Sequence, residues 1–102
     1  MAEKIFVDEV EEFGRGEYRT VFHGNTDVAV VNVDNKYYAL EDVCTHDGGV
    51  LTGGKIEGDE IECPRHQARF AIKTGEVLAP PAFEDVETFK TEVEDGKVFV
   101  YI

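Results

Sequence analysis

The sequence has few positive charges, no long apolar run and only two cysteines. Ten lysines and arginines stand against 22 aspartates and glutamates, which gives a formal net charge of −12. Such a charge excludes nucleic acid and an anionic membrane surface as partners, because their phosphates would be repelled rather than neutralised. The acidity fits either docking onto a basic patch of a partner protein or simple solubility.

No stretch approaches the ~20 consecutive apolar residues that a membrane-spanning helix needs. The N-terminal MAEKIFVDEV also lacks the basic-then-apolar layout of a signal peptide. We therefore expect a cytoplasmic protein. Structural disulfides are disfavoured in that reducing compartment, so two cysteines that each stand near a histidine indicate metal binding before cross-linking.

The chain of 102 residues, 42% of them apolar, suffices for one small domain with a single modest core. Short runs rich in Val, Tyr, Phe and Ile, separated by turn residues, predict strands. These runs are 17–22, 27–33, 36–40, 60–63, 69–72, 89–94 and 97–102. Room for a helical turn exists at 7–13. We expect an all-β fold, a small sandwich or barrel-like arrangement of antiparallel sheets.

Turn chemistry supports this strand pattern. Asp95-Gly96, between the last two runs, is a two-residue hairpin signal that needs a positive φ at both positions. From Cys44 to Pro81, three prolines and six glycines break the strand rhythm. We expect a loop-rich subdomain at about 41–81, inserted between strands of the main β unit.

Both cysteines and two of the three histidines lie in the stretch CTHDGGVLTGGKIEGDEIECPRH. Cys44 and His46 are separated by one residue, so on an extended segment their side chains point to the same side. Cys63 and His66 are three apart, a spacing that one tight turn brings together. We predict that these four residues bind metal, with one sulfur and one nitrogen at each end of the stretch.

Two kinds of metal site fit this ligand set. Two cysteines and two histidines are a familiar zinc composition, which would close a tetrahedral structural site. Structural zinc sites commonly pair Cys with Cys and His with His, whereas both pairs here are mixed. A binuclear centre can sort mixed pairs by giving both cysteines to one iron and both histidines to the other, which is the ligand set of a Rieske [2Fe–2S] centre.

The sequence also resembles a known family. CTHDGG followed by CPRHQARFAIKTGE is similar to the two cluster-binding loops of Rieske proteins. The stretches YYALEDVCTH, TGEVLAPPAF and VEDGKVFVYI match the layout of stand-alone Rieske ferredoxins, and the first fifteen residues are the least diagnostic. The resemblance implies a single Rieske domain over residues 1–102, with three stacked antiparallel sheets and one [2Fe–2S] cluster at the tip of the small subdomain.

The resemblance also implies roles for individual residues. Cys44 and Cys63 would ligate the inner iron, and His46 and His66 the outer iron near the surface, where an electron can leave. The loop glycines would let backbone N–H donors approach the bridging sulfides, since no Cβ intervenes. These glycines are residues 48, 49, 53 and 54. The pair Pro80-Pro81 is similar to the proline-bearing segment that covers the cluster in the family.

Two departures from the respiratory and photosynthetic Rieske subunits bear on function. Those subunits join the two loops by a disulfide, at positions that are Gly49 and Arg65 here. They also place a Ser and a Tyr as donors to the sulfurs, at positions that are Ala68 and Phe70 here. Each such donor would stabilise the charge that reduction adds. Their absence therefore predicts a low reduction potential, on the order of −150 mV.

The function implied is that of an electron carrier rather than an enzyme. It would take single electrons from a flavin-containing, NAD(P)H-dependent ferredoxin reductase and pass them to a terminal oxygenase, such as an aromatic-ring-hydroxylating dioxygenase. A Rieske oxygenase itself needs a second iron held by two histidines and a carboxylate. Only His23 is left outside the motif, and 102 residues give no room for a catalytic domain.

Alternatives within the same class stay open at this point. They are the small Rieske subunit of an assimilatory nitrite reductase, and a general-purpose Rieske ferredoxin; a zinc-binding module is a third possibility outside that class. We expect a monomer that docks at its exposed histidine edge. Arg65 and Arg69 flank the second loop, so we expect that edge to be neutral or locally positive on an acidic body.

Overall fold

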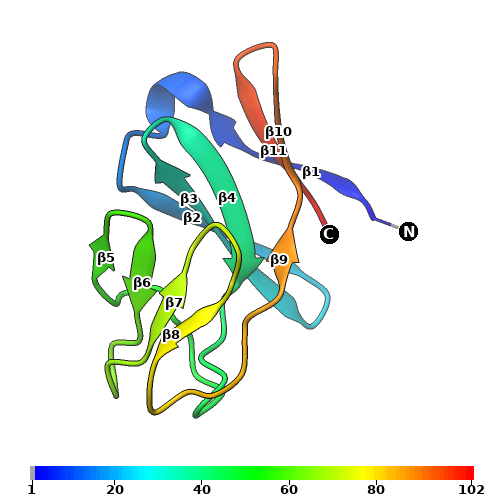
Figure 1. Ribbon diagram of the computed structural model, residues 1–102. Coiled ribbons are helices and arrows are strands. Elements are labelled where there is room, and N and C mark those ends of the chain that lie inside the picture. The colour runs from blue at the N-terminus through cyan, green and yellow to red at the C-terminus, as the bar shows by residue number, and fades with distance from the viewer. Residues whose placement is uncertain (1) are drawn as a thin grey trace.

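The computed structural model describes residues 2–102 and contains three antiparallel β-sheets (Figure 1). The terminal sheet has the order β1 (Lys4–Glu9), β11 (Lys97–Tyr101), β10 (Thr91–Glu94). The central sheet has the order β2 (Tyr18–His23), β3 (Thr26–Val33), β4 (Lys36–Glu41), β9 (Thr88–Phe89). The small sheet has the order β5 (Ile56–Glu57), β6 (Glu60–Glu62), β7 (Arg69–Ala71), β8 (Val77–Ala79). The predicted all-β fold of three antiparallel sheets is confirmed.

The central sheet separates two hydrophobic cores. On β3, Val28 and Val30 pack into the core shared with the terminal sheet, whereas Ala29 and Val31 pack into the core shared with the small sheet. Successive side chains of a strand point to opposite faces, so a strand covered on both faces is apolar at nearly every position. This explains why the run VAVV shows no polar alternation.

Left-handed turn residues close the hairpins as the turn chemistry predicts. Asp95 and Gly96 have φ values of 52° and 73° and join β10 to β11. Asp34 and Asn35, with φ values of 53° and 66°, join β3 to β4 in the same way. The buried side chain of Asn32 accepts a hydrogen bond from the Asn35 backbone N–H at 2.7 Å, which fixes this second turn.

The segment 7–13 does contain a helical turn, but its first part belongs to a strand that the sequence did not predict. Lys4–Glu9 form β1, which pairs with β11 at the other end of the chain, and the helical part is a 3₁₀ turn at Val10–Glu12. The backbones of Glu3 and Ile102 exchange two hydrogen bonds of 2.7 and 3.0 Å. Pairing between segments so distant in sequence leaves no local signal. The short strands β5 and β8 lie outside the predicted runs, and β9 overlaps the predicted run 89–94 only at Phe89.

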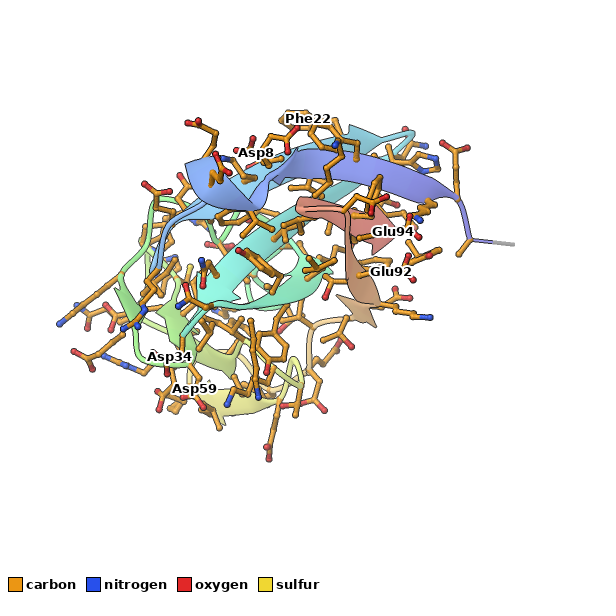
Figure 2. All side chains as sticks on the ribbon, turned by 90° about the horizontal axis from the view of Figure 1, so that it is seen from above. Asp8, Phe22, Asp34, Asp59, Glu92 and Glu94 are labelled. Carbon is orange, nitrogen blue, oxygen red and sulfur yellow. The ribbon has the colours of Figure 1, made fainter. Side chains whose placement is uncertain are left out.

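Acidic side chains are spread over the surface, as the labelled Asp8, Asp34, Asp59, Glu92 and Glu94 in Figure 2 illustrate. Some of them are paired: Lys4 contacts Glu92 at 3.0 Å and Glu94 at 2.8 Å. Within residues 2–102, no helix is long and apolar enough to cross a membrane.

Candidate metal centre

The four predicted ligands lie on two loops at one end of the molecule, one between β4 and β5 and the other between β6 and β7 (Figure 1). The sulfurs of Cys44 and Cys63 lie within 4.8 Å of each other and of an Asp47 carboxylate oxygen. Ring nitrogens of His46 and His66 likewise lie within 4.8 Å of each other and of Asp47. The structure thus brings together residues that the sequence separates by about twenty positions.

The two kinds of ligand differ in burial. Cys44 and Cys63 are fully buried and belong to the core shared by the central and small sheets. His46 and His66 are exposed, with ring centroids 5.0 Å apart and ring planes at 86°. Burial raises the pKa of the Cys44 thiol, so a metal must displace a proton to bind there. The site therefore has a soft sulfur interior and an imidazole edge open to solvent.

The two loops have the same backbone hydrogen bonds at the same offsets. The Cys44 N–H donates to the Gly49 carbonyl at 2.7 Å, and the Cys44 carbonyl accepts from Gly48 N–H at 2.7 Å. In the second loop, the Cys63 N–H donates to the Ala68 carbonyl at 2.7 Å, and the Cys63 carbonyl accepts from Gln67 N–H at 3.0 Å. Each loop is therefore a tight turn that presents its cysteine from a fixed backbone.

Both turns need a left-handed residue at the fourth position after the cysteine. Gly48 has a φ of 77° and Gln67 a φ of 64°. Glycine adopts this conformation without steric cost, whereas a side chain such as that of Gln67 costs about 1–2 kcal/mol there. The equivalence of the two loops cannot be recognised from the sequence, because the left-handed position is glycine in the first loop and glutamine in the second.

A buried carboxylate anchors the first loop. Asp42 Oδ1 accepts hydrogen bonds from the backbone N–H groups of Leu51 at 2.7 Å and Thr52 at 2.9 Å, and its Oδ2 accepts from the Thr52 hydroxyl at 2.7 Å. Its own N–H donates to the Asp27 carbonyl at 2.8 Å, which ties the loop to the start of β3. Asp42 is 5% exposed, and these hydrogen bonds offset the cost of burying its carboxylate.

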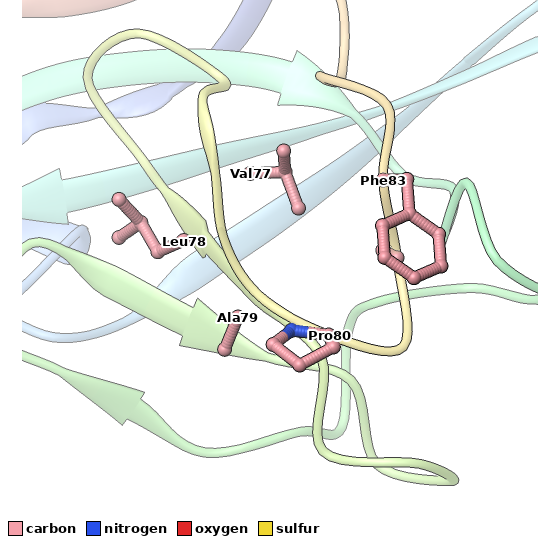
Figure 3. A pocket seen from close by; sticks show the side chains of 6 residues that line it. Val77, Leu78, Ala79, Pro80 and Phe83 are labelled. Atoms are coloured by element: carbon pink, nitrogen blue, oxygen red, sulfur yellow. The ribbon is translucent and has the colours of Figure 1, made fainter.

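A third segment, residues 80–84, lies beside the loops. The Thr45 hydroxyl donates to the Glu84 carbonyl at 2.7 Å, which fastens the segment to the first loop. Pro80-Pro81 is a cis peptide in this segment. Figure 3 shows a shallow apolar hollow here, between β8 and the side chain of Phe83, which is 85% exposed.

The arginines beside the second loop form ion pairs with carboxylates. Arg65 pairs with Asp47 at 2.6 Å, and Arg69 pairs with Glu62 at 2.9 Å and with Glu60 at 3.3 Å. The guanidinium of Arg65 holds the pKa of the Asp47 carboxyl far below its ordinary range. Arg69 also lies 3.5 Å from Glu57, so these two arginines stand against four carboxylates and do not make the surface beside the second loop locally positive.

His23 lies apart from this centre, at the end of β2. Its Nε2 is 3.7 Å from a carboxylate oxygen of Glu3. The His23 side chain therefore takes no part in the group of cysteines and histidines at the loop end.

Comparison with known proteins decides the family. A family model described as "Rieske [2Fe-2S] domain" matches residues 3–90. The chain belongs to this Rieske family. The donor set fits the group that the family name describes, because two buried sulfurs and two exposed imidazoles face one another across the loops. Family membership thus implies a Rieske-type iron–sulfur cluster.

Relatives with known roles are ferredoxin components. The biphenyl dioxygenase ferredoxin subunit of a Pseudomonas species is 37% identical over 92 residues, 89% of this chain and 84% of that protein. The 3-phenylpropionate/cinnamic acid dioxygenase ferredoxin subunit of Photorhabdus laumondii is 32% identical over 100 residues, 97% of this chain and 94% of that protein.

Solved structures agree with this assignment. A chain from a complex of reduced oxygenase and oxidized ferredoxin in carbazole 1,9a-dioxygenase superposes with a TM-score of 0.91 and 35% identity, covering 95% of this chain and 91% of that chain. The Sphingomonas yanoikuyae B1 ferredoxin superposes with a TM-score of 0.87 and 33% identity, covering 96% and 97%. The predicted resemblance to Rieske ferredoxins is confirmed.

Proposed function

We propose that Cys44 and Cys63 bind one iron, and His46 and His66 the other iron, of a single [2Fe–2S] cluster. The observation that carries this proposal is the separation of the donors into a buried sulfur pair and an exposed imidazole pair. A tetrahedral zinc site would gather all four donors around one point, with Zn–S and Zn–N bonds of about 2.3 and 2.1 Å. The bound cluster supplies one-electron transfer, and its potential is set by the protein around it.

The protein acts as a ferredoxin that carries single electrons to a terminal oxygenase of the aromatic-ring-hydroxylating type. Its relatives are the ferredoxin subunits of such dioxygenase systems, and a structural neighbour comes from an oxygenase–ferredoxin complex. The chain's own contribution is geometric: it keeps the sulfurs in the core and exposes His46 and His66 where a partner can approach. We assign the electron donor to a flavin-containing, NAD(P)H-dependent reductase.

Two further expectations complete the proposal. Residues 41–81 act as a cluster-binding subdomain, supported by the position of β5–β8 between β4 and β9 in the chain and by the shared core beneath them. The protein acts as a monomer in the cytoplasm. Its net charge of −12 suits a partner with a basic docking surface.

The ligand set is tested by replacing His66 with alanine and measuring iron, acid-labile sulfide and the visible spectrum of aerobically purified protein. The wild type should be reddish-brown, with iron and sulfide in equal amounts, and His66→Ala should lose both together with the colour. His23→Ala is the matched control, because His23 lies on β2 and pairs with Glu3.

Either of two results would contradict the assignment. A colourless wild type that contains zinc would identify a zinc module. A His66→Ala protein with unchanged iron content would remove His66 from the ligand set.

A further inference from the structure

Arg65 of the second loop reaches across to the first loop. Its Nε donates to Asp47 Oδ2 at 2.6 Å and its Nη2 donates to Asp47 Oδ1 at 3.0 Å. This two-pronged contact fixes the guanidinium plane as well as its position. The Gly49 backbone N–H also donates to Asp47 Oδ1 at 2.9 Å, so the carboxylate is held in place from its own loop.

The same guanidinium contacts a sulfur ligand. Arg65 Nη2 lies 3.3 Å from Cys63 Sγ, within hydrogen-bonding distance of the atom that we propose as an iron ligand. A positive donor at a ligand sulfur stabilises the more negative, reduced form of an iron–sulfur centre, because hydrogen bonds to the sulfurs and nearby charge set the potential. Arg65 is about one-third exposed, so solvent screens its charge less than that of a free surface lysine.

Glycine at position 49 makes room for this arrangement. A Cβ built on Gly49 would lie 2.6 Å from Arg65 Cζ, 2.7 Å from Nη2 and 2.9 Å from Nε. Any side chain there would push the guanidinium away from both Asp47 and Cys63. The requirement for glycine is thus set by the arginine of the opposite loop, since Gly49 itself is not in the left-handed region.

We propose that Arg65 is a positioning residue with two effects on the centre. Its ion pair with Asp47 clamps the two cluster-binding loops together, and its contact with Cys63 Sγ raises the reduction potential above that of the same centre without it. This inference rests on the proposed ligand set. It assigns to Arg65, Asp47 and Gly49 a joint role that the ligand motif does not include.

The test compares Arg65→Gln with the wild type in two measurements on the purified holoprotein. The first is the rate at which visible absorbance disappears in excess iron chelator, and the second is the midpoint potential by spectroelectrochemistry. We expect about fivefold faster loss of the cluster absorbance, the change that one well-formed, partly exposed ion pair produces. We also expect a lower midpoint potential, which a purely structural clamp would not produce.

Arg69→Gln is the matched control, because it removes the same charge from the same subdomain. Arg69 pairs with Glu60 and Glu62 on the small sheet rather than with the ligand loops. A shift of the midpoint potential in Arg65→Gln no larger than in Arg69→Gln would overturn the proposal. Iron-free wild-type protein would instead contradict the proposed ligand set.

Gly49→Ala provides a second variant that keeps every charge. It should displace the guanidinium without removing it, so the potential should fall in the same direction as in Arg65→Gln. If Arg65→Gln does not retain its cluster, the midpoint potential of Gly49→Ala still tests whether the guanidinium affects the centre. A Gly49→Ala protein with the wild-type potential and the wild-type rate of cluster loss would overturn the proposal.

Discussion

Replacing Gly48 by alanine tests whether the left-handed turn of the first loop controls cluster retention. Gly48 has a φ of 77°, and its N–H donates at 2.7 Å to the carbonyl of Cys44, a proposed ligand. A Cβ at this position would meet no atom within 4 Å. The substitution therefore changes the backbone preference alone, without a steric clash.

The magnitude follows from two opposing contributions. Holding alanine in the left-handed region costs about 1–2 kcal/mol. The smaller conformational freedom of alanine in the unfolded chain offsets about 0.4–1 kcal/mol of this cost. The net loss is about 1 kcal/mol, which corresponds to about a fivefold larger population of the opened loop. If opening of the loop precedes cluster release, the release rate should rise about fivefold.

The assay is the decay of visible absorbance in chelator, compared with the thermal stability of the same protein. Gly24→Ala is the control, because Gly24 has a φ of 61°, meets no atom within 4 Å and lies in the β2–β3 hairpin. It should lower the thermal stability to a similar extent while leaving the release rate near that of the wild type. Gln67→Gly, in the equivalent turn of the second loop, should slow release.

A Gly48→Ala protein that releases its cluster no faster than Gly24→Ala would refute this reasoning. The strain would then be spread over the whole fold rather than confined to the loop.

Three other predictions concern the reduction potential and the docking of the partner. Phe70→Tyr with Ala68→Ser, both buried positions, should raise the midpoint potential at unchanged iron content; a wild-type potential above about +100 mV would contradict the low-potential assignment. Electron-transfer rates to the oxygenase should fall as salt shortens the Debye length from ~10 Å toward ~3 Å. Phe83→Ala, beside the loops, should weaken binding to the oxygenase. Phe22→Ala should not, although Phe22 is also highly exposed, on the edge strand β2. Equal effects of the two substitutions would argue against docking at the loop end.

The candidate ligands could be proposed from the sequence because metal centres select particular residue types at particular spacings. Cys44, His46, Cys63 and His66 form two mixed pairs, and only a few metal centres use such a set. The longer strands were predictable for a similar local reason: β3 and β11 are runs of β-branched and aromatic residues bounded by turn residues. Local composition thus determined the all-β class, the long strands and the candidate ligands.

Contacts between distant segments were decided by the tertiary structure. β1 exists because β11 supplies its hydrogen-bonding partner, and Val7–Phe13 alone is equally compatible with a helical turn. The pairing of Asp47 with Arg65, eighteen positions apart, depends on how closely the two loops approach and on the space left by Gly49. Burial of the sulfurs and exposure of the imidazoles follow from packing against the central sheet. Such features depend on distances in space, which residue spacing along the chain does not specify.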